Sequence, residues 1–502
     1  MRFLDRTSQN KTWGRIIDAA AVLFFAFFVV GPLFFILTSL GQFKFSETML
    51  SALLTSFEVA FVVTAIDLLF GIPLAWLMSR KKFPALPLVD AIIDLPLIIP
   101  TSSLGLSIAL FWGAQGLGLI NPGLGLIIVL HIAFTFSYVV RTVQAAIMEI
   151  DPDLDRAAGT LGASPLLSFR SIWMPLFRAG VISGAILAFT RSLGETGATM
   201  IVAGAQKTVP ILTVYFKNST PPDTNSAISI SIISLVLSAA LFFLVQRSAV
   251  MRRYSLGRVY ANAEKKLSNF GWCLDSAVLL FLFIIVLVPS FYFLKFTDLD
   301  FFNIRALDAI IVSFGVALAA TAASVVFGFP LALFIASKNR ASGVIKLLVE
   351  MSMLMPTVTI GLSLSLFWAG KLDEIFVLIL AHIAMIFSFF VSPVAEILSD
   401  MDKSLIEVAR SLGARPFYAF RTVVLPIVKP TVIAGLVVAF MRSVSETGGT
   451  LAVSKSIITV PLLIVNLTKE NLPGAAASAA ALLLAISLLL VFVLRMSQRK
   501  KW

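Results

Sequence analysis

Long apolar runs separated by short polar segments make up most of this chain. A helix needs about 20 mostly apolar residues to cross a bilayer. Runs of this kind occur at residues 16–40, 52–78, 90–112, 124–144, 179–204, 226–246, 272–294, 308–336, 345–368, 374–395, 430–454 and 475–495. Prolines inside these runs, such as Pro73, Pro96, Pro100, Pro330 and Pro356, are tolerated because neighbouring helices can bond the carbonyls that they free. The pattern predicts an all-α membrane protein with about 12 transmembrane helices.

One polar segment occurs twice, as DPDLDRAAGTLGASPLLSFRSIWMP at residues 151–175 and as DKSLIEVARSLGARPFYAFRTVVLP at residues 402–426. Gly162 and Gly413 lie 251 positions apart, and the same offset relates many residues that flank them. A repeat of this length predicts two six-helix halves related by a pseudo-two-fold axis. We expect a first transmembrane domain at 1–246, a cytoplasmic linker at 247–268 and a second transmembrane domain at 269–502.

Composition supports a membrane location, because 59% of the residues are hydrophobic and only 13% are charged, with a mean hydropathy of +0.98. The net charge of +12 could suggest nucleic acid, but the basic residues border the apolar runs. Most of them fall on the side of the N-terminus, the two repeated segments and the C-terminus, which predicts that this side is cytoplasmic. The first run is too long for the core of a signal peptide, so we expect an uncleaved first span.

No catalytic residue is predicted, because the sequence contains no GxxxxGK[ST], HExxH or GxSxG motif. The single cysteine, Cys273, excludes a disulfide within the chain and makes redox chemistry improbable. If the protein uses ATP, another subunit has to bind and hydrolyse it.

Each repeated segment predicts a short cytoplasmic helix. In the first copy Asp151 provides an N-cap and Gly162 can end the helix; in the second copy Asp402 or Ser404 provides the cap and Gly413 the stop. A further segment then leads through a proline into the next span. A short exposed helix can dock in a groove of a partner, whereas the alternative is an amphipathic loop at the lipid interface. Duplication with identical spacing favours docking.

These residues resemble the cytoplasmic loop of binding-protein-dependent ABC importer permeases, with its pattern of EAA, three residues, Gly, nine residues and I-x-L-P. The resemblance covers essentially the whole chain and implies the type I permease fold, with each loop acting as the coupling helix seated in a nucleotide-binding subunit. The residues that match this motif are Arg156, Ala157, Ala158, Gly162, Pro175, Glu407, Val408, Ala409, Gly413 and Pro426. Arg156 departs from the acidic residue of the family.

An ionisable pair follows each loop, Arg191 with Glu195 and Arg442 with Glu446. The spacing of four residues puts both side chains on one helical face, inside a predicted span. Either they form structural ion pairs, or they line the translocation path. The residues proposed for this path are Arg191, Glu195, Thr196, Thr199, Arg442, Glu446, Thr447 and Thr450.

Four other polar residues are expected to have structural roles. Asp94 and Glu350 begin corresponding spans and are expected to pair with basic residues on neighbouring loops. His131 and His382 are expected at the external ends of their spans, as packing or interfacial residues. One histidine in each half is a weak signal for a metal site, so no metal ligand is predicted.

The resemblance implies an importer in which two copies of a cytoplasmic ABC ATPase carry ATP and Mg, and an extracytoplasmic binding protein delivers the solute. No cofactor on this chain, no nucleic acid and no second permease chain are expected. We also expect a location in the prokaryotic cytoplasmic membrane with both termini cytoplasmic.

The solute is less well defined. The stretch from Ser192 to Gly204 with the following TVPILTVYF is similar to molybdate, tungstate and sulfate permeases, and the two membrane arginines suit an oxyanion. The fused layout instead resembles ferric-iron and thiamine importers, and a phosphonate-like solute is a further alternative. An ion-gradient-driven secondary transporter is the remote alternative, but such a carrier does not need the repeated loop. An exporter permease is a further possibility that the loop disfavours.

Overall fold

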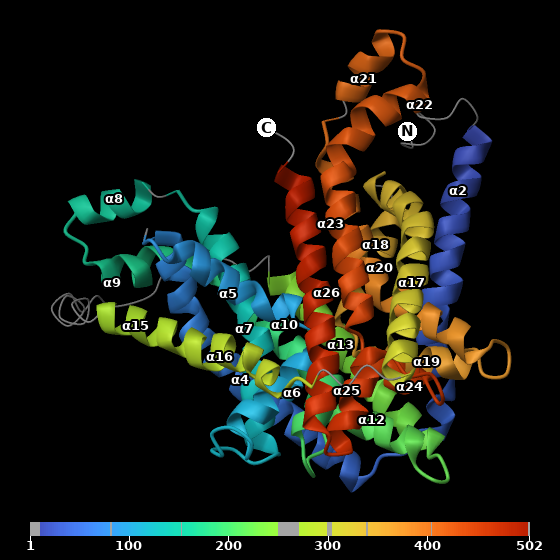
Figure 1. The fold of residues 1–502 in the computed structure, drawn as a ribbon. Coiled ribbons are helices and arrows are strands. Elements are labelled where there is room, and N and C mark those ends of the chain that lie inside the picture. Colours follow the sequence, from blue (N-terminus) through green and yellow to red (C-terminus); the bar gives the residue numbers. More distant parts are fainter. Residues whose placement is uncertain are drawn as a thin grey trace. The chain divides into compact units, whose positions relative to one another are not determined.

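The computed structural model describes residues 11–80, 83–151, 153–248, 271–298, 304–337, 340–402 and 404–499. Within these ranges all regular secondary structure is helical. The expected linker at 247–268 lies almost entirely outside the described residues. The longer helices of the first half are α2 (Lys11–Phe24), α4 (Glu47–Arg80), α7 (Leu124–Met148), α10 (Met174–Gly194) and α13 (Thr224–Ser248). The helices at the corresponding places of the second half are α15 (Gly271–Phe281), α17 (Ile304–Ala336), α20 (Glu374–Asp400), α23 (Leu425–Val444) and α26 (Pro473–Arg499) (Figure 1).

Ten of the described helical segments are long and apolar enough to cross a membrane, and two bent helix pairs raise the number to 12 if each pair counts as one span. The bent pairs are α5 (Leu86–Ile98) with α6 (Thr101–Trp112), and α18 (Arg340–Leu354) with α19 (Thr357–Phe367). They occupy the runs predicted as single spans at 90–112 and 345–368. The bends are 109° and 111°. Pro100 and Pro356 cap the second helix of each pair, because a proline disfavours helical backbone in the residue before it.

The helix in the region predicted as one span at 179–204 differs from the prediction at both ends. Upstream, α10 continues from a π-helical turn, Phe169–Trp173, because Pro175 occupies its first turn, where no backbone N–H is needed. Downstream, α10 ends at Gly194, and a short helix, α11 (Gly197–Val202), follows. In the second half, α24 (Gly448–Val453) follows α23 in the same way.

Two further helices were not predicted, α12 (Val209–Asn218) and α25 (Val460–Lys469). Each has 10 residues, which is half of the length needed to cross a bilayer. A search for spanning runs therefore passes over them. Each lies between a short helix and the last span of its half.

The described helices form two compact units that exchange segments of sequence. Unit 1 contains Met1–Ser46, Pro210–Val236 and Phe296–Trp502, and unit 2 contains Glu47–Val209 and Leu237–Lys295. The first span of each half thus packs in the unit built mainly from the other half. In unit 1 the ring of Phe24 stacks on Phe327, with centroids 3.8 Å apart. In unit 2 Phe281 stacks on Phe70 at 4.0 Å.

The same exchange is fixed by hydrogen bonds within each unit. Ser363 Oγ donates to the backbone carbonyl of Pro32 in unit 1, and Ser107 Oγ donates to that of Pro289 in unit 2. Both serines lie on the second helix of a bent pair, and both acceptors lie on a first span. The two units therefore repeat one packing scheme, as the duplication predicts.

Candidate functional site: two helix breaks and two exposed loops

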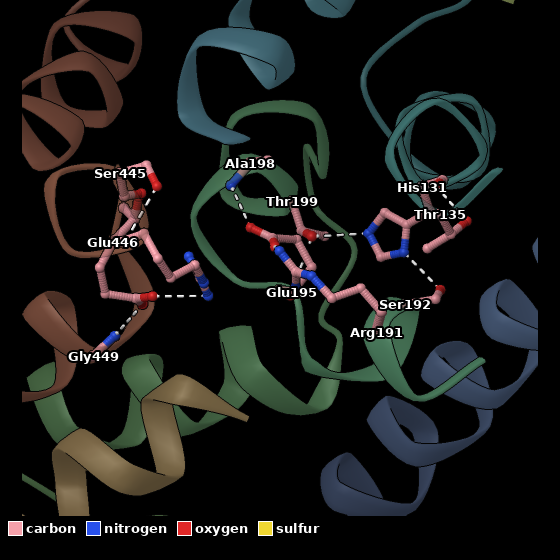
Figure 2. A network of polar contacts seen from close by, with 12 residues as sticks. His131, Thr135, Arg191, Ser192, Glu195, Ala198, Thr199, Ser445, Glu446 and Gly449 are labelled. Carbon is pink, nitrogen blue, oxygen red and sulfur yellow. Dashed lines mark hydrogen bonds and ion pairs between the residues drawn. The ribbon is translucent and has the colours of Figure 1, made fainter. Parts of the chain in front are cut away.

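The break after α10 holds the first of the ionisable pairs predicted from the sequence. Arg191 Nη2 lies 2.6 Å from Glu195 Oε2, and the other carboxylate oxygen accepts a bond of 3.3 Å from the backbone N–H of Ala198. Glu195 therefore caps α11 while it pairs with the last turn of α10 (Figure 2). The side chain of Arg191 is 23% exposed, and that of Glu195 is 6% exposed.

The break after α23 repeats this arrangement in unit 1. Arg442 Nη2 lies 2.9 Å from Glu446 Oε2, and Glu446 Oε1 accepts a bond of 3.1 Å from the N–H of Gly449 (Figure 2). Here too the arginine side chain is 23% exposed and the carboxylate is buried. In each unit, therefore, the exposed part of the pair is cationic.

Each short helix packs closely on the second helix of a bent pair. A Cβ atom at Gly105 would lie 2.9 Å from Ala198 Cα in unit 2, and one at Gly361 would lie 2.6 Å from the carbonyl oxygen of Gly449 in unit 1. Real Cβ atoms do not approach a backbone this closely, so only glycine fits at either position. The breaks are thus held against rigid backbone.

The two histidines do not lie at interfacial helix ends. His131 is in the third turn of α7 and His382 is in the third turn of α20, and both are almost completely buried. Their rings contact hydroxyls on both sides of each break, and these contacts occupy Thr199 and Thr450. The identical offset of 251 for the histidines, for Ser192 and Ser443, and for the two threonines was the sequence signal that could have revealed this network.

The first exposed loop contains α8 (Asp153–Thr160), a turn at Gly162 and then α9 (Pro165–Ser168). Gly162 has a φ of +82°, which is left-handed backbone that favours glycine. Ala157 is exposed and Ala158 is buried. Arg156 forms an ion pair of 2.9 Å with Asp153, but both side chains are so exposed that the pair contributes little stability.

The second exposed loop contains α21 (Ser404–Ser411), a turn at Gly413 and then α22 (Pro416–Ala419). Gly413 has a φ of +86°, and its turn borders a pocket of about 500 Å³. Asp402 accepts hydrogen bonds from the side chain and backbone of Ser404, and these bonds lower the pKa of the aspartate. Glu407 and Val408 are exposed, and Ala409 lines the pocket.

The two acidic residues near the start of the bent pairs have helical partners. Asp94 binds Arg141 of α7 at 2.7 Å, and Asp90 binds the same guanidinium at 2.6 Å. Glu350 lies 3.6 Å from Lys346, one turn earlier on α18. The expected partners on neighbouring loops are therefore replaced by partners on helices, Arg141 on α7 and Lys346 on α18.

A fold of two repeated helical units with bent helix pairs, helix breaks and exposed loop helices is that of a transport permease. A family model described as "Binding-protein-dependent transport system inner membrane component" matches residues 68–253 and again 324–502. The chain belongs to this family, and it is a multi-pass inner membrane protein with the all-α type I permease fold.

Individual relatives correspond to about half of this chain. A sulfate transport system permease protein of Salmonella typhimurium is 31% identical over 255 residues, which are 47% of this chain and 91% of the relative. The corresponding protein of Escherichia coli is 34% identical over 39% of this chain and 74% of the relative. A molybdate/tungstate transport system permease protein of Methanocaldococcus jannaschii is 31% identical over 45% of this chain and 92% of the relative.

Proposed function

We propose that the two halves of this chain together form the permease of an ATP-driven importer for tetrahedral oxyanions such as sulfate, molybdate or tungstate. The observation that carries the proposal is the charge arrangement at the two helix breaks. Each glutamate has both carboxylate oxygens engaged, whereas each arginine is partly exposed. An exposed guanidinium favours an anion over a cation in a medium of low dielectric constant. The printed names of the relatives agree with this solute class.

The translocation path in this proposal is lined from each unit by the residues at its break. Arg191 and Arg442 supply the charges that attract the anion, and their glutamates keep the guanidinium groups oriented. Thr196 and Thr447 follow the pairs and begin the short helices. Thr199 and Thr450 act through the histidines, because their hydroxyls are already bonded there.

Energy comes from outside the chain in this proposal. Helices α8 and α21 dock in two copies of a cytoplasmic ABC ATPase, which bind ATP and Mg. These helices are suited to docking because exposed apolar residues lie beside the left-handed glycines. Leu161 is 89% exposed, and Leu412 is 82% exposed. This arrangement places both termini in the cytoplasm and the docking site of a solute-binding protein on the opposite face.

The test is ATP hydrolysis by the permease and its co-purified ATPase in lipid discs, with the binding protein and a panel of solutes. We expect stimulation by sulfate, molybdate or tungstate. Stimulation only by ferric iron, thiamine or a phosphonate would refute the oxyanion proposal. Uptake driven by a proton gradient without any ATPase would refute the importer mechanism as well.

A charge-balanced variant tests the role of the arginines. Replacing Arg191 and Glu195 together by glutamine removes the pair without leaving a buried charge, and it should reduce anion uptake. Replacement of Lys371 by glutamine is the control, because this lysine is exposed and remote in sequence from both breaks. Equal uptake by the two variants would exclude Arg191 from the path.

A further inference from the structure

Each helix break is bridged by one histidine from a neighbouring helix. In unit 2, His131 Nδ1 lies 2.8 Å from Ser192 Oγ, and Nε2 lies 2.9 Å from Thr199 Oγ1. Ser192 is in the last turn of α10, and Thr199 is in α11. The imidazole therefore joins the helix before the break to the helix after it (Figure 2).

The hydrogen bonds of the threonine indicate how the proton is placed. Thr199 Oγ1 lies 3.2 Å from the backbone carbonyl oxygen of Glu195, to which it can donate its only hydrogen. It then accepts from His131, so Nε2 carries the hydrogen. Nδ1 of a neutral ring is left to accept from Ser192. A neutral imidazole thus satisfies every donor, and both nitrogens are occupied, so neither can bind a metal.

Unit 1 contains the same bridge with the same atoms. His382 Nδ1 lies 2.8 Å from Ser443 Oγ, and Nε2 lies 3.1 Å from Thr450 Oγ1. Thr450 in turn lies 3.3 Å from the carbonyl oxygen of Glu446. Both copies keep the segment R-S-x-x-E-T-G-x-T around the break together with the histidine, so the triad of histidine, serine and threonine belongs to the repeated break.

We propose that His131 and His382 are positioning residues that fix the angle at each break and so hold the arginine in the orientation needed for transport. The inference rests on the proposed function for the role of the arginine. The carboxylate that caps the short helix also binds the arginine, so a change in the angle of that helix moves the guanidinium. Imidazole is suited to this task because its two nitrogens reach hydroxyls in opposite directions.

The bridge has two arms, the hydrogen bond of His131 with Ser192 of α10 and that with Thr199 of α11. Two substitutions of His131 each keep one arm and remove the other. Asparagine places a polar atom near the position of Nδ1, and glutamine places one near that of Nε2. His131→Asn should therefore behave like Thr199→Val, which loses the arm to α11. His131→Gln should behave like Ser192→Ala, which loses the arm to α10.

The readout is the labelling rate of a cysteine on the short helix, with Met200→Cys in a Cys273→Ser background and a maleimide as the probe. Loss of one hydrogen bond should raise the labelling rate about five- to tenfold in Thr199→Val and in His131→Asn. The double variant of these two should label no faster than either single variant, because both remove the same arm. Thr190→Val is the matched control, since its hydroxyl bonds only within α10, to the carbonyl of Ile186.

Labelling needs no solute, so it tests the bridge even if no oxyanion stimulates ATP hydrolysis. Unchanged labelling in Thr199→Val and His131→Asn, or equal effects of these variants and Thr190→Val, would overturn the inference. Additive effects in the double variant would do so as well. Monodisperse elution and a cooperative melting transition of the Thr199→Val protein establish that it is folded. The same design with Thr450→Val repeats the test in the other unit.

Discussion

The left-handed turns after α8 and α21 allow a quantitative test of the proposed ATPase contact. Gly162 has a φ of +82°, and a Cβ atom there would meet nothing within 4 Å. Replacement by alanine therefore adds no clash and acts only through the backbone. A residue with a side chain pays about 1–2 kcal/mol to adopt this conformation. That cost reduces the population of the correct turn by a factor of about 5–30.

The measurement is the apparent affinity of the purified permease for its ATPase, together with solute-stimulated hydrolysis. If docking requires the observed turn, Gly162→Ala should weaken this affinity by the same factor of about 5–30. Gly162→Asn should have a smaller effect, because asparagine tolerates left-handed backbone.

Gly159→Ala provides the matched control. Gly159 lies inside α8, three residues before the turn, and its Cβ would also meet nothing within 4 Å. Alanine there should favour the helix by about 0.5–1 kcal/mol and leave the affinity unchanged or improved. Equal affinities for Gly159→Ala and Gly162→Ala would refute the reasoning, since only one of them demands left-handed backbone.

Three further predictions concern stability. Arg191→Gln should lower the melting temperature more than the double replacement of Arg191 and Glu195 by glutamine, because breaking one side of a buried pair costs about 3–5 kcal/mol. The opposite order would contradict the burial of the carboxylate. Gly105→Ala should destabilise the protein by about 1–3 kcal/mol in thermal unfolding, because the added methyl group overpacks against α11. Gly315→Ala on α17 is the control and should not destabilise the protein, because its Cβ would meet open space. The bonds that lower the pKa of Asp402 are present above its usual range and are lost as the pH falls through the lowered value. The protection of the α21 amides, measured relative to the intrinsic exchange rate at each pH, should therefore fall on acidification, and Asp402→Asn should abolish that response.

The repeat and the membrane class could be predicted from the sequence because both depend on local patterns. Apolar runs of sufficient length predict spans whatever their neighbours are. The loop glycines could be predicted because left-handed backbone has a strong residue preference, and their φ angles agree with the predicted helix ends. The structure does not test whether these loops dock in an ATPase, so that role stays a prediction.

Other features depend on contacts between distant segments, and for these the sequence gives weak signals. The bends at Pro100 and Pro356 require packing of α6 and α19 against the short helices, whereas Pro73 lies in a continuous helix. The surroundings of His131 were missed because its partners lie 61 and 68 residues away. The exchange of first spans between halves has no local sequence pattern at all.

That exchange imposes an order on synthesis. The first span, 16–40, leaves the ribosome early, but its stacking partner Phe327 and the helices around it are made far later. At about 5–20 residues per second, this span waits on the order of 15–60 s for its neighbours in unit 1. Unit 2 likewise stays incomplete until α15 has been made, although most of it is translated first. Because the two halves are covalently joined, the first span stays near its future partners, and the two halves are made in equal number. Separate chains would have to find each other by diffusion.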